Sequence, residues 1–188
     1  KGSTVGIKGP TGCGKSTLGN IIIGLLDPTK GQLFVDDILI NFQNKTAWQK
    51  NISIIPQSIF LNDVSIAENI AIGVDPKKIN LEKVKNAAKQ AQIADFIESI
   101  PNQYEEKVGE RGIRLSGGQR QRIGIARALY REAKIILFDE ATNQLDTDTE
   151  SLVMQSINNL NKEITIIFIA HRISTLKNCD QIVDLTKL

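Results

Sequence analysis

A glycine-rich run near the amino terminus has the residue types of a phosphate-binding loop. It fits the pattern GxxxxGK[ST], in which glycines let backbone amides turn inward and approach an anion closely. Lys15 is expected to reach the β- and γ-phosphates of a nucleotide, and Ser16 to offer its hydroxyl to Mg²⁺. A helix predicted to begin near Lys15 would aim its positive dipole end at the same phosphates. The predicted nucleotide-binding residues here are Gly9, Pro10, Thr11, Gly12, Cys13, Gly14, Lys15, Ser16 and Thr17.

Two acidic residues follow an apolar run in the last third of the chain. Ile135–Phe138 is typical of a strand buried on both faces, and Asp139 and Glu140 come directly after it. In open parallel sheets, ligands bind at the carboxyl ends of the strands. We expect Asp139 to hold Mg²⁺, directly or through water, and Glu140 to activate the attacking water as general base. Alone, the same two residues could simply be a solvated acidic pair that caps a strand. The phosphate loop elsewhere in the sequence favours the catalytic interpretation.

A second turn suited to an anion lies before a predicted helix, in the run LSGGQ at residues 115–119. Ser116 is a natural N-cap residue, and Gln119, three residues later, completes a capping box. Gly117 and Gly118 expose the first amides of the helix. A single nucleotide does not need two such helix N-termini, and by itself this turn would be an ordinary capped helix.

The LSGGQ run, with residues 120–129 after it, resembles the signature of the ATP-binding cassette (ABC) ATPase family. The resemblance covers nearly the whole chain. It implies a head-to-tail dimer of two ABC ATPase domains, with ATP and Mg²⁺ held between the loop of one copy and the signature of the other. Ser116, Gly117, Gly118 and Gln119 would then bind the nucleotide of the partner.

Three further residues match the family in order along the chain. Gln57 falls at the family's glutamine loop, which implies contact with Mg²⁺ and the attacking water. His171, the only histidine, resembles the switch histidine that contacts the γ-phosphate. Asp146 falls at the aspartate loop across the dimer, although Asn143 and Gln144 stand where the family usually has Ser-Ala.

Two segments resemble the exporter branch of the family, Ser65–Ile70 and Val108–Gly112. That resemblance implies a transmembrane domain as partner, a place at the cytoplasmic face of the cell membrane, and hydrolysis of ATP coupled to export. The alternatives are a soluble non-transport ABC ATPase of the DNA-repair or translation type, and a regulatory domain that binds ATP without hydrolysing it. Glu140 and His171 argue against the regulatory domain.

Strands that alternate with helices must position these residues. The pattern indicates an α/β, P-loop NTPase fold, with a mostly parallel sheet flanked by helices. Capping boxes are predicted at Ser65 with Glu68 and at Thr147 with Glu150. The predicted strands are 3–8, 32–36, 38–40, 52–55, 135–138, 165–170 and 182–185, and the longer predicted helices are 15–26, 81–99, 116–133 and 147–161.

The whole of 1–188 is expected to be one ABC ATPase domain. Its RecA-like core would comprise about 1–57 and 134–188, and a helical subdomain carrying the signature would comprise about 58–133. Compared with the family, the chain starts at the strand that leads into the phosphate loop. We therefore expect an N-terminal truncation and an incomplete antiparallel β-subdomain.

The composition is that of a globular domain, with 188 residues, 41% hydrophobic and 23% charged. A net charge of +2 gives no sign of a nucleic-acid partner. Cys13 and Cys179 form no spaced disulfide framework, which indicates a reducing compartment. No apolar run approaches the ~20 residues that cross a bilayer, so no direct membrane insertion by this segment is expected.

Overall fold

The structure is a computed structural model that describes residues 1–141, 146, 148–152, 155, 164–169, 176 and 179–187. These residues belong to two compact units. The second unit contains the segment predicted to be the helical subdomain and takes in 141–162 as well, which the sequence analysis assigned to the core. The first unit comprises Lys1–Pro56, Ala133–Glu140 and Glu163–Leu188, and the second comprises Gln57–Glu132 and Ala141–Lys162.

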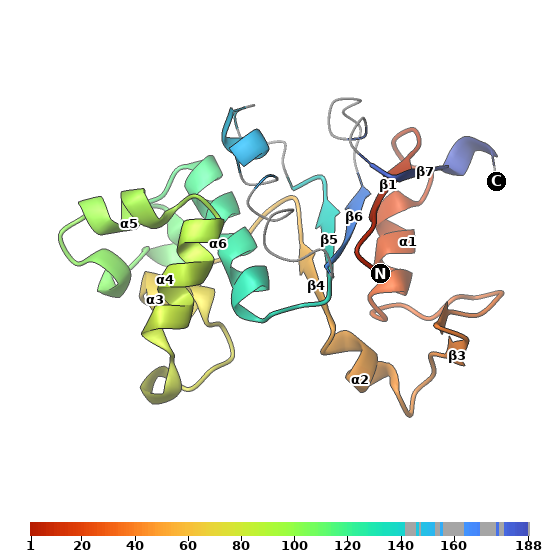
Figure 1. Cartoon of the computed structure of the whole chain (residues 1–188), viewed down its shortest axis with the longest axis horizontal. Coiled ribbons are helices and arrows are strands. Elements are labelled where there is room, and N and C mark those ends of the chain that lie inside the picture. The colour runs from red at the N-terminus through yellow and green to blue at the C-terminus, as the bar shows by residue number, and fades with distance from the viewer. Residues whose placement is uncertain are drawn as a thin grey trace. The chain divides into compact units, whose positions relative to one another are not determined.

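The first unit is built on a five-stranded sheet in the order β4-β5-β6-β1-β7, in which every pair is parallel (Figure 1). Parallel pairing follows from the sequence, because the central strands read as continuous apolar runs that need cover on both faces. The carboxyl ends of all these strands therefore meet at one edge of the sheet. The strands are β1 (Thr4–Lys8), β4 (Ile52–Ile55), β5 (Ile135–Asp139), β6 (Thr165–Ile169) and β7 (Gln181–Asp184).

Helix α1 (Lys15–Ile22) follows β1 and packs against the sheet at Gly19. A Cβ on Gly19 would lie 2.8 Å from Ile169 Cδ1, so a larger residue would have to displace the end of that side chain. The predicted extension of the helix to Leu26 is wrong. The helix ends at a left-handed Gly24 (φ 72°), whose amide and that of Leu25 bond back to helix carbonyls in a Schellman motif.

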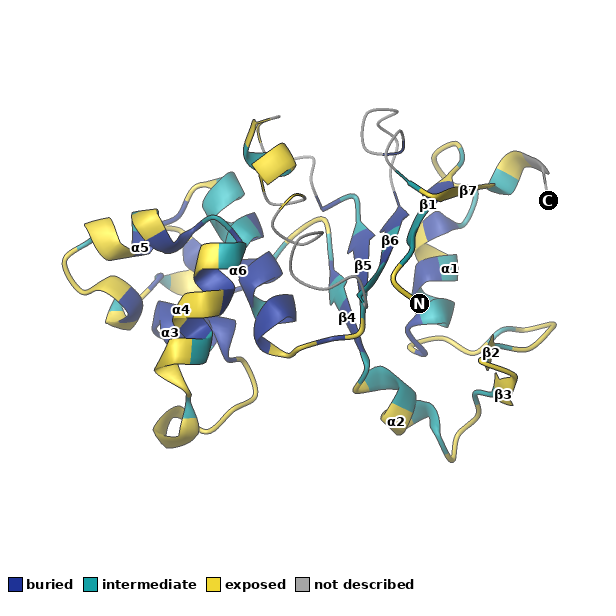
Figure 2. Cartoon of the chain, in the orientation of Figure 1, coloured by how far each residue is buried: buried dark blue, intermediate teal, exposed yellow. Residues whose placement is uncertain are grey.

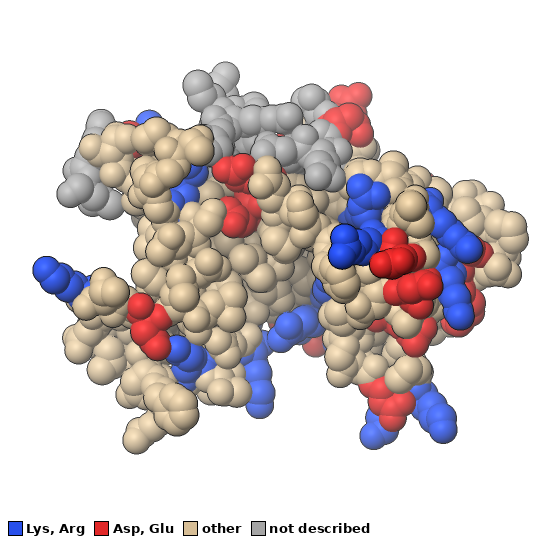
Figure 3. Space-filling view, turned by 180° about the vertical axis from the view of Figure 1, so that it is seen from behind, with Lys and Arg blue, Asp and Glu red and all other residues tan. Residues whose placement is uncertain are grey.

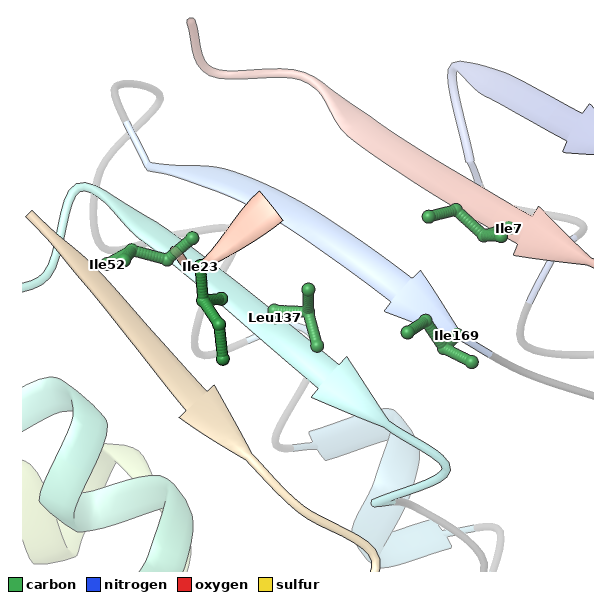
Figure 4. Close-up of a cluster of buried hydrophobic side chains, with 5 residues drawn as sticks. All are labelled: Ile7, Ile23, Ile52, Leu137 and Ile169. Atoms are coloured by element: carbon green, nitrogen blue, oxygen red, sulfur yellow. The ribbon is translucent and has the colours of Figure 1, made fainter. Parts of the chain in front are cut away.

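A cluster of buried aliphatic side chains joins α1 to the sheet (Figure 4). Its members come from β1, the carboxyl end of α1, β4, β5 and β6. They fix the helix over the strands whose ends carry the candidate site. The five are Ile7, Ile23, Ile52, Leu137 and Ile169.

A short antiparallel hairpin lies between α1 and β4, as the acidic turn residues predicted. Strands β2 (Phe34–Val35) and β3 (Ile38–Leu39) are joined by Asp36 and Asp37, both left-handed at φ 48° and 64°. Positive φ at both central positions is the geometry of the two-residue turns that match strand twist. The sheet has only these two strands within the described residues.

Helix α2 (Lys45–Gln49) follows the hairpin and was not predicted, because it is too short to show apolar periodicity. It caps the end of α1. Trp48 Nε1 donates to Ile22 O at 2.7 Å, and Gln49 Nε2 donates to Gly24 O at 2.8 Å. These bonds satisfy carbonyls that the helix end leaves without partners.

The second unit is helical, and its described helices turn their apolar sides to one another (Figure 2). The predicted capping box of Ser65 and Glu68 is confirmed at the start of α3. The predicted single helix 81–99 is wrong, because Gln92 adopts a left-handed conformation (φ 56°) and splits it. The elements are α3 (Ile66–Ile70), η1 (Pro76–Lys78), α4 (Leu81–Gln90), α5 (Ala94–Ser99), η2 (Gln103–Glu105), η3 (Glu110–Gly112) and α6 (Gly117–Tyr130).

Charged side chains of both signs are interspersed on the face drawn in Figure 3. The described residues on that face form no continuous basic stripe. Among the described residues, no helix combines the length and the apolar composition that crossing a bilayer requires. The chain ends in a short η4 (Leu185–Lys187).

Replacing Trp48 with phenylalanine should destabilise the chain, because it removes the indole N–H and part of the ring that packs on the core. The substitution removes the donor to Ile22 O, and a lost hydrogen bond of this kind costs about 0.5–1.5 kcal/mol. Urea unfolding followed by circular dichroism should show a lower midpoint with an unchanged slope. Phe42→Leu, at a side chain that is 95% exposed, is the control and should leave the midpoint in place. An unchanged midpoint for Trp48→Phe would contradict the capping function.

Candidate active site

The loop between β1 and α1 has a backbone that only glycine adopts without strain. Gly12 and Gly14 lie at φ 83° and 95°, in the left-handed region. A Cβ at either position would meet no atom within 4 Å, so the requirement comes from backbone conformation and not from space. The turn that results presents backbone amides beside the first residues of α1. This is the concave arrangement that binds phosphate.

Lys15 is held inside this loop by backbone carbonyls of the loop itself. Its side chain is only 5% exposed, and Nζ donates to Gly9 O at 2.9 Å and to Pro10 O at 3.0 Å. An ammonium has three N–H donors, and these two carbonyls accept two of them, so the third can bind an anion. The loop therefore positions a buried positive charge where an anion can meet it.

Ser16 and Asp139 are brought together from segments far apart in the sequence. Ser16 Oγ donates to Asp139 Oδ1 at 3.3 Å. Partial burial raises the pKa of Asp139 above its ordinary value, and the nearby Glu140 raises it further, while the Ser16 hydrogen bond and Lys15 act in the opposite direction. The carboxylate is therefore poorly solvated and gains from a cation.

Glu140 directly follows the last residue of β5 and turns away from the strand. Its backbone is left-handed (φ 53°), and its amide donates to Ile169 O at 2.9 Å, which ties the turn to β6. The turn directs Glu140 to the wall of a pocket of about 260 Å³ over the phosphate loop. The other lining residues are Thr11, Gly12, Gly14, Lys15, Ser16 and Thr17.

The oxygen donors of this pocket fit Mg²⁺ that is shared with a bound phosphate. Proteins hold Mg²⁺ through one or two carboxylates together with substrate phosphates and water. Ser16 and Asp139 supply a hydroxyl and a carboxylate side by side. No group of three or more His, Cys, Asp or Glu side chains within the described ranges could hold a metal alone. The donor set therefore suits a cation that binds with its nucleotide.

Cys13 belongs to the loop but does not line the pocket. Its Sγ packs against Gly9, where an added Cβ would lie only 2.6 Å from the sulfur. Gly9 thus makes room for the thiol, and Cys13 acts as a packing residue behind the loop.

The Ser116 turn has the predicted capping geometry and is accessible. Ser116 Oγ accepts from Gln119 N at 3.2 Å, and Gln119 Oε1 accepts from Ser116 N at 2.8 Å. Ser116 is exposed, and Gly117 and Gly118 are partly exposed, so the first amides of α6 can be reached by a ligand. The sequence analysis missed Arg120, whose guanidinium donates to Leu115 O at 2.6 Å and steadies the turn.

Of the remaining predicted site residues, the structure describes Gln57 and Asp146. Gln57 is exposed and begins the second unit. Asp146 is exposed, and its side chain accepts from Thr149 N at 2.9 Å, a bond that lowers the pKa of Asp146. Asp146 thus caps the helical residues 148–152. The predicted cap Thr147, the switch residue His171, and Asn143 with Gln144 lie outside the described residues.

Comparison with known proteins gives consistent matches. The ABC transporter family matches residues 1–143. The chain is 44% identical to multidrug resistance protein pgp-1 of Caenorhabditis elegans, over 95% of this chain and 14% of that protein. It is 40% identical to the ATP-dependent lipid A-core flippase of Pasteurella multocida, over 97% of this chain and 31% of that protein.

A solved structure of a bacterial Atm1-family ABC exporter with ATP bound superimposes with a TM-score of 0.90 at 41% identity. The match covers 97% of this chain and 32% of the exporter chain. The chain thus spans less than a third of the length of each of these relatives.

Asp139→Asn should stabilise the metal-free chain near neutral pH. The pKa of Asp139 lies above its ordinary 3.8, so the folded chain holds this proton to a higher pH than the unfolded chain does. As the pH rises from about 3.8 to the folded pKa, the unfolded chain loses this proton before the folded chain does, so stability falls across that interval; the full penalty persists at higher pH and disappears below about 3.8. Urea unfolding in EDTA should show a gain at pH 7 that shrinks towards pH 3.5.

Asp63→Asn, at an exposed aspartate, controls for the change in net charge. An Asp139→Asn protein that is less stable than wild type at pH 7 would show that burial does not dominate at this carboxylate.

Proposed function

The chain belongs to the ABC transporter family, and from that premise we propose that it is the ATP-binding and ATP-hydrolysing domain of an exporter. Membership of the family implies ATP binding. The observation that carries the proposal is that Lys15, Ser16 and Glu140 line one pocket over a phosphate loop, with Asp139 hydrogen-bonded to Ser16 beside it. The printed names of the relatives, a multidrug resistance protein and a flippase among them, support export across a membrane.

The reaction is hydrolysis of ATP to ADP and phosphate. Lys15 and the loop amides bind the β- and γ-phosphates, and Ser16, Asp139 and Gln57 would hold Mg²⁺, which neutralises charge on the phosphates. Glu140 accepts the proton of the attacking water as general base, and His171 contacts the γ-phosphate. Since little covalent chemistry falls to the protein, positioning and charge stabilisation supply most of the acceleration.

The partner of the site is a second copy or a homologous domain, placed head to tail. Its Ser116, Gly117, Gly118 and Gln119 would close on the γ-phosphate, with Asp146 at the interface. The exposed, fully capped Ser116 turn supports this, because its accessible helix amides can bind a phosphate that a partner presents.

A transmembrane domain is the second partner. The working location is then the cytoplasmic face of the membrane, with residues 1–188 forming one domain made of a core and a helical subdomain. Closure on ATP and release after hydrolysis would drive transport.

Glu140→Gln should lower ATP turnover by about 10²–10⁴-fold, because the amide cannot accept the proton of the attacking water. ATP binding should persist, since Lys15 and the loop are untouched. Turnover is measured by phosphate release and binding by equilibrium titration with ATP. Glu105→Gln, at an exposed glutamate of the second unit, is the matched control. Wild-type turnover in Glu140→Gln would remove this residue from catalysis.

Mixing two inactive variants tests the shared site. Lys15→Ala removes the ammonium that binds phosphate, and Ser116→Arg blocks the signature turn. Each variant alone should therefore be inactive. A mixed dimer has one site with both faults and one with neither. An equal mixture should recover about a quarter of the wild-type rate, because random pairing makes half of the dimers mixed. No recovery from two variants that each bind a wild-type partner would show that the site lies within one chain.

A further inference from the structure

The segment that starts with Gln57 lies against the flank of α6 (Gly117–Tyr130). Ile59 fills a notch at Gly124, where an added Cβ would lie 2.4 Å from Ile59 Cδ1 and 2.8 Å from Ile59 Cγ1. Real Cβ atoms do not approach other carbons this closely, so a side chain at position 124 would have to displace Ile59 from this position. Glycine is unfavourable there by about 1 kcal/mol relative to alanine. The contact with Ile59 explains its presence.

One turn further along α6, Arg127 holds the same segment by hydrogen bonds. Its Nε donates to Asn69 O at 3.0 Å, and one terminal nitrogen donates to Phe60 O at 3.2 Å. Burial lowers the pKa of Arg127, but a guanidinium stays charged in proteins. A desolvated guanidinium that donates to two backbone carbonyls holds the backbone at both Asn69 and Phe60.

Asn69 closes the segment into a rigid loop. The residue is fully buried, and its side chain exchanges two hydrogen bonds with the backbone of Asn62, each at 3.0 Å. It also donates to Ser65 O at 3.1 Å. The stretch from Phe60 to Asn69 therefore has its backbone tied at both ends, and Arg127 joins both ends to α6.

The same helix begins at the Ser116 turn. Gly124 and Arg127 lie about 12 and 16 Å along the helix from Ser116, at ~1.5 Å per residue. Arg120 ties the residue before the turn, Leu115, to the first part of α6. An α-helix of this length is stiff, so the Ser116 turn at its start and the segment held at Gly124 and Arg127 move together.

We propose that Gly124 and Arg127 are positioning residues for ATP hydrolysis, which fix the Gln57 segment on α6 so that Gln57 and the Ser116 turn take their places together. This inference rests on the proposed function of the chain. Gln57 lies two residues before Ile59, so its Cα can lie at most ~7 Å from the Cα of Ile59, which is held at Gly124. Loosening that point would misplace Gln57 without touching Lys15 or its loop.

Gly124→Ala in the complete protein that contains this chain should lower kcat for ATP by about 10–100-fold, as misplacement by about an ångström does. The Mg²⁺ concentration for half-maximal turnover should rise, since Gln57 is a proposed Mg²⁺ ligand. ATP affinity measured by equilibrium titration should not change. The double variant with Ile59→Ala removes the side chain that the new methyl group strikes. It should regain turnover to within about threefold of Ile59→Ala alone.

Arg127→Lys gives an independent test that does not depend on tolerance of the Gly124 change. Lysine keeps the charge but lacks the planar fork that bridges two carbonyls. The same fall in kcat and rise in Mg²⁺ requirement are expected. Arg131→Lys, at an exposed arginine four residues on, is the matched control and should match wild type.

Unchanged kcat and unchanged Mg²⁺ dependence in both Gly124→Ala and Arg127→Lys would overturn the inference. Loss of ATP affinity in parallel with kcat would also overturn it, because it would indicate general damage to the fold. If Gly124→Ala does not fold, Arg127→Lys decides. A wild-type protein that hydrolyses no ATP would instead refute the proposed function, so the two failures are distinguishable.

Discussion

The hydrogen bond from Ser16 to Asp139 is the contact on which the candidate site depends. It joins residues 123 positions apart, and it forms because β1 and β5 run parallel in one sheet and end at the same edge. One strand delivers the phosphate loop and the other delivers two carboxylates. A slip in register would separate the metal donors from the lysine, so the aliphatic cluster beneath α1 contributes to the chemistry as well as to stability.

This arrangement makes the ionised form of Asp139 electrostatically unfavourable. Asp139 is partly withdrawn from water and lies near a second carboxylate, Glu140, while Lys15 and Ser16 offset only part of the cost. A bound phosphate would oppose the carboxylates further, and a divalent cation between phosphate and carboxylate relieves both. The burial of Asp139 beside Glu140 thus favours a divalent cation that arrives together with a phosphate, as proposed for Mg²⁺ and the nucleotide.

The sequence predicted the parts whose signals are local. Residue spacing located the loop, strand β4 at its observed bounds, and the caps at Ser65 and Ser116. It did not predict the break at Gln92, because a left-handed glutamine has no sequence signature and the apolar spacing continues across it. Helix α2 was not predicted, because it is too short to show apolar periodicity and because its capping of α1 through Trp48 is a tertiary contact. The sequence analysis did not consider Asp146 as a cap, although aspartate is a good N-cap residue and Asp146 accepts from Thr149 N.

The two anion-binding turns are each complete without the other. The loop at Lys15 is organised by its own carbonyls in the first unit, and the turn at Ser116 by its own capping box in the second. The hydrogen bonds named here that organise each turn come from residues of its own unit. A turn of exposed amides that is already organised costs little to hold ready, and it gains free energy only when a phosphate is presented to it. Each turn is therefore organised before a phosphate is presented to it, which is what the proposed closure on ATP would require.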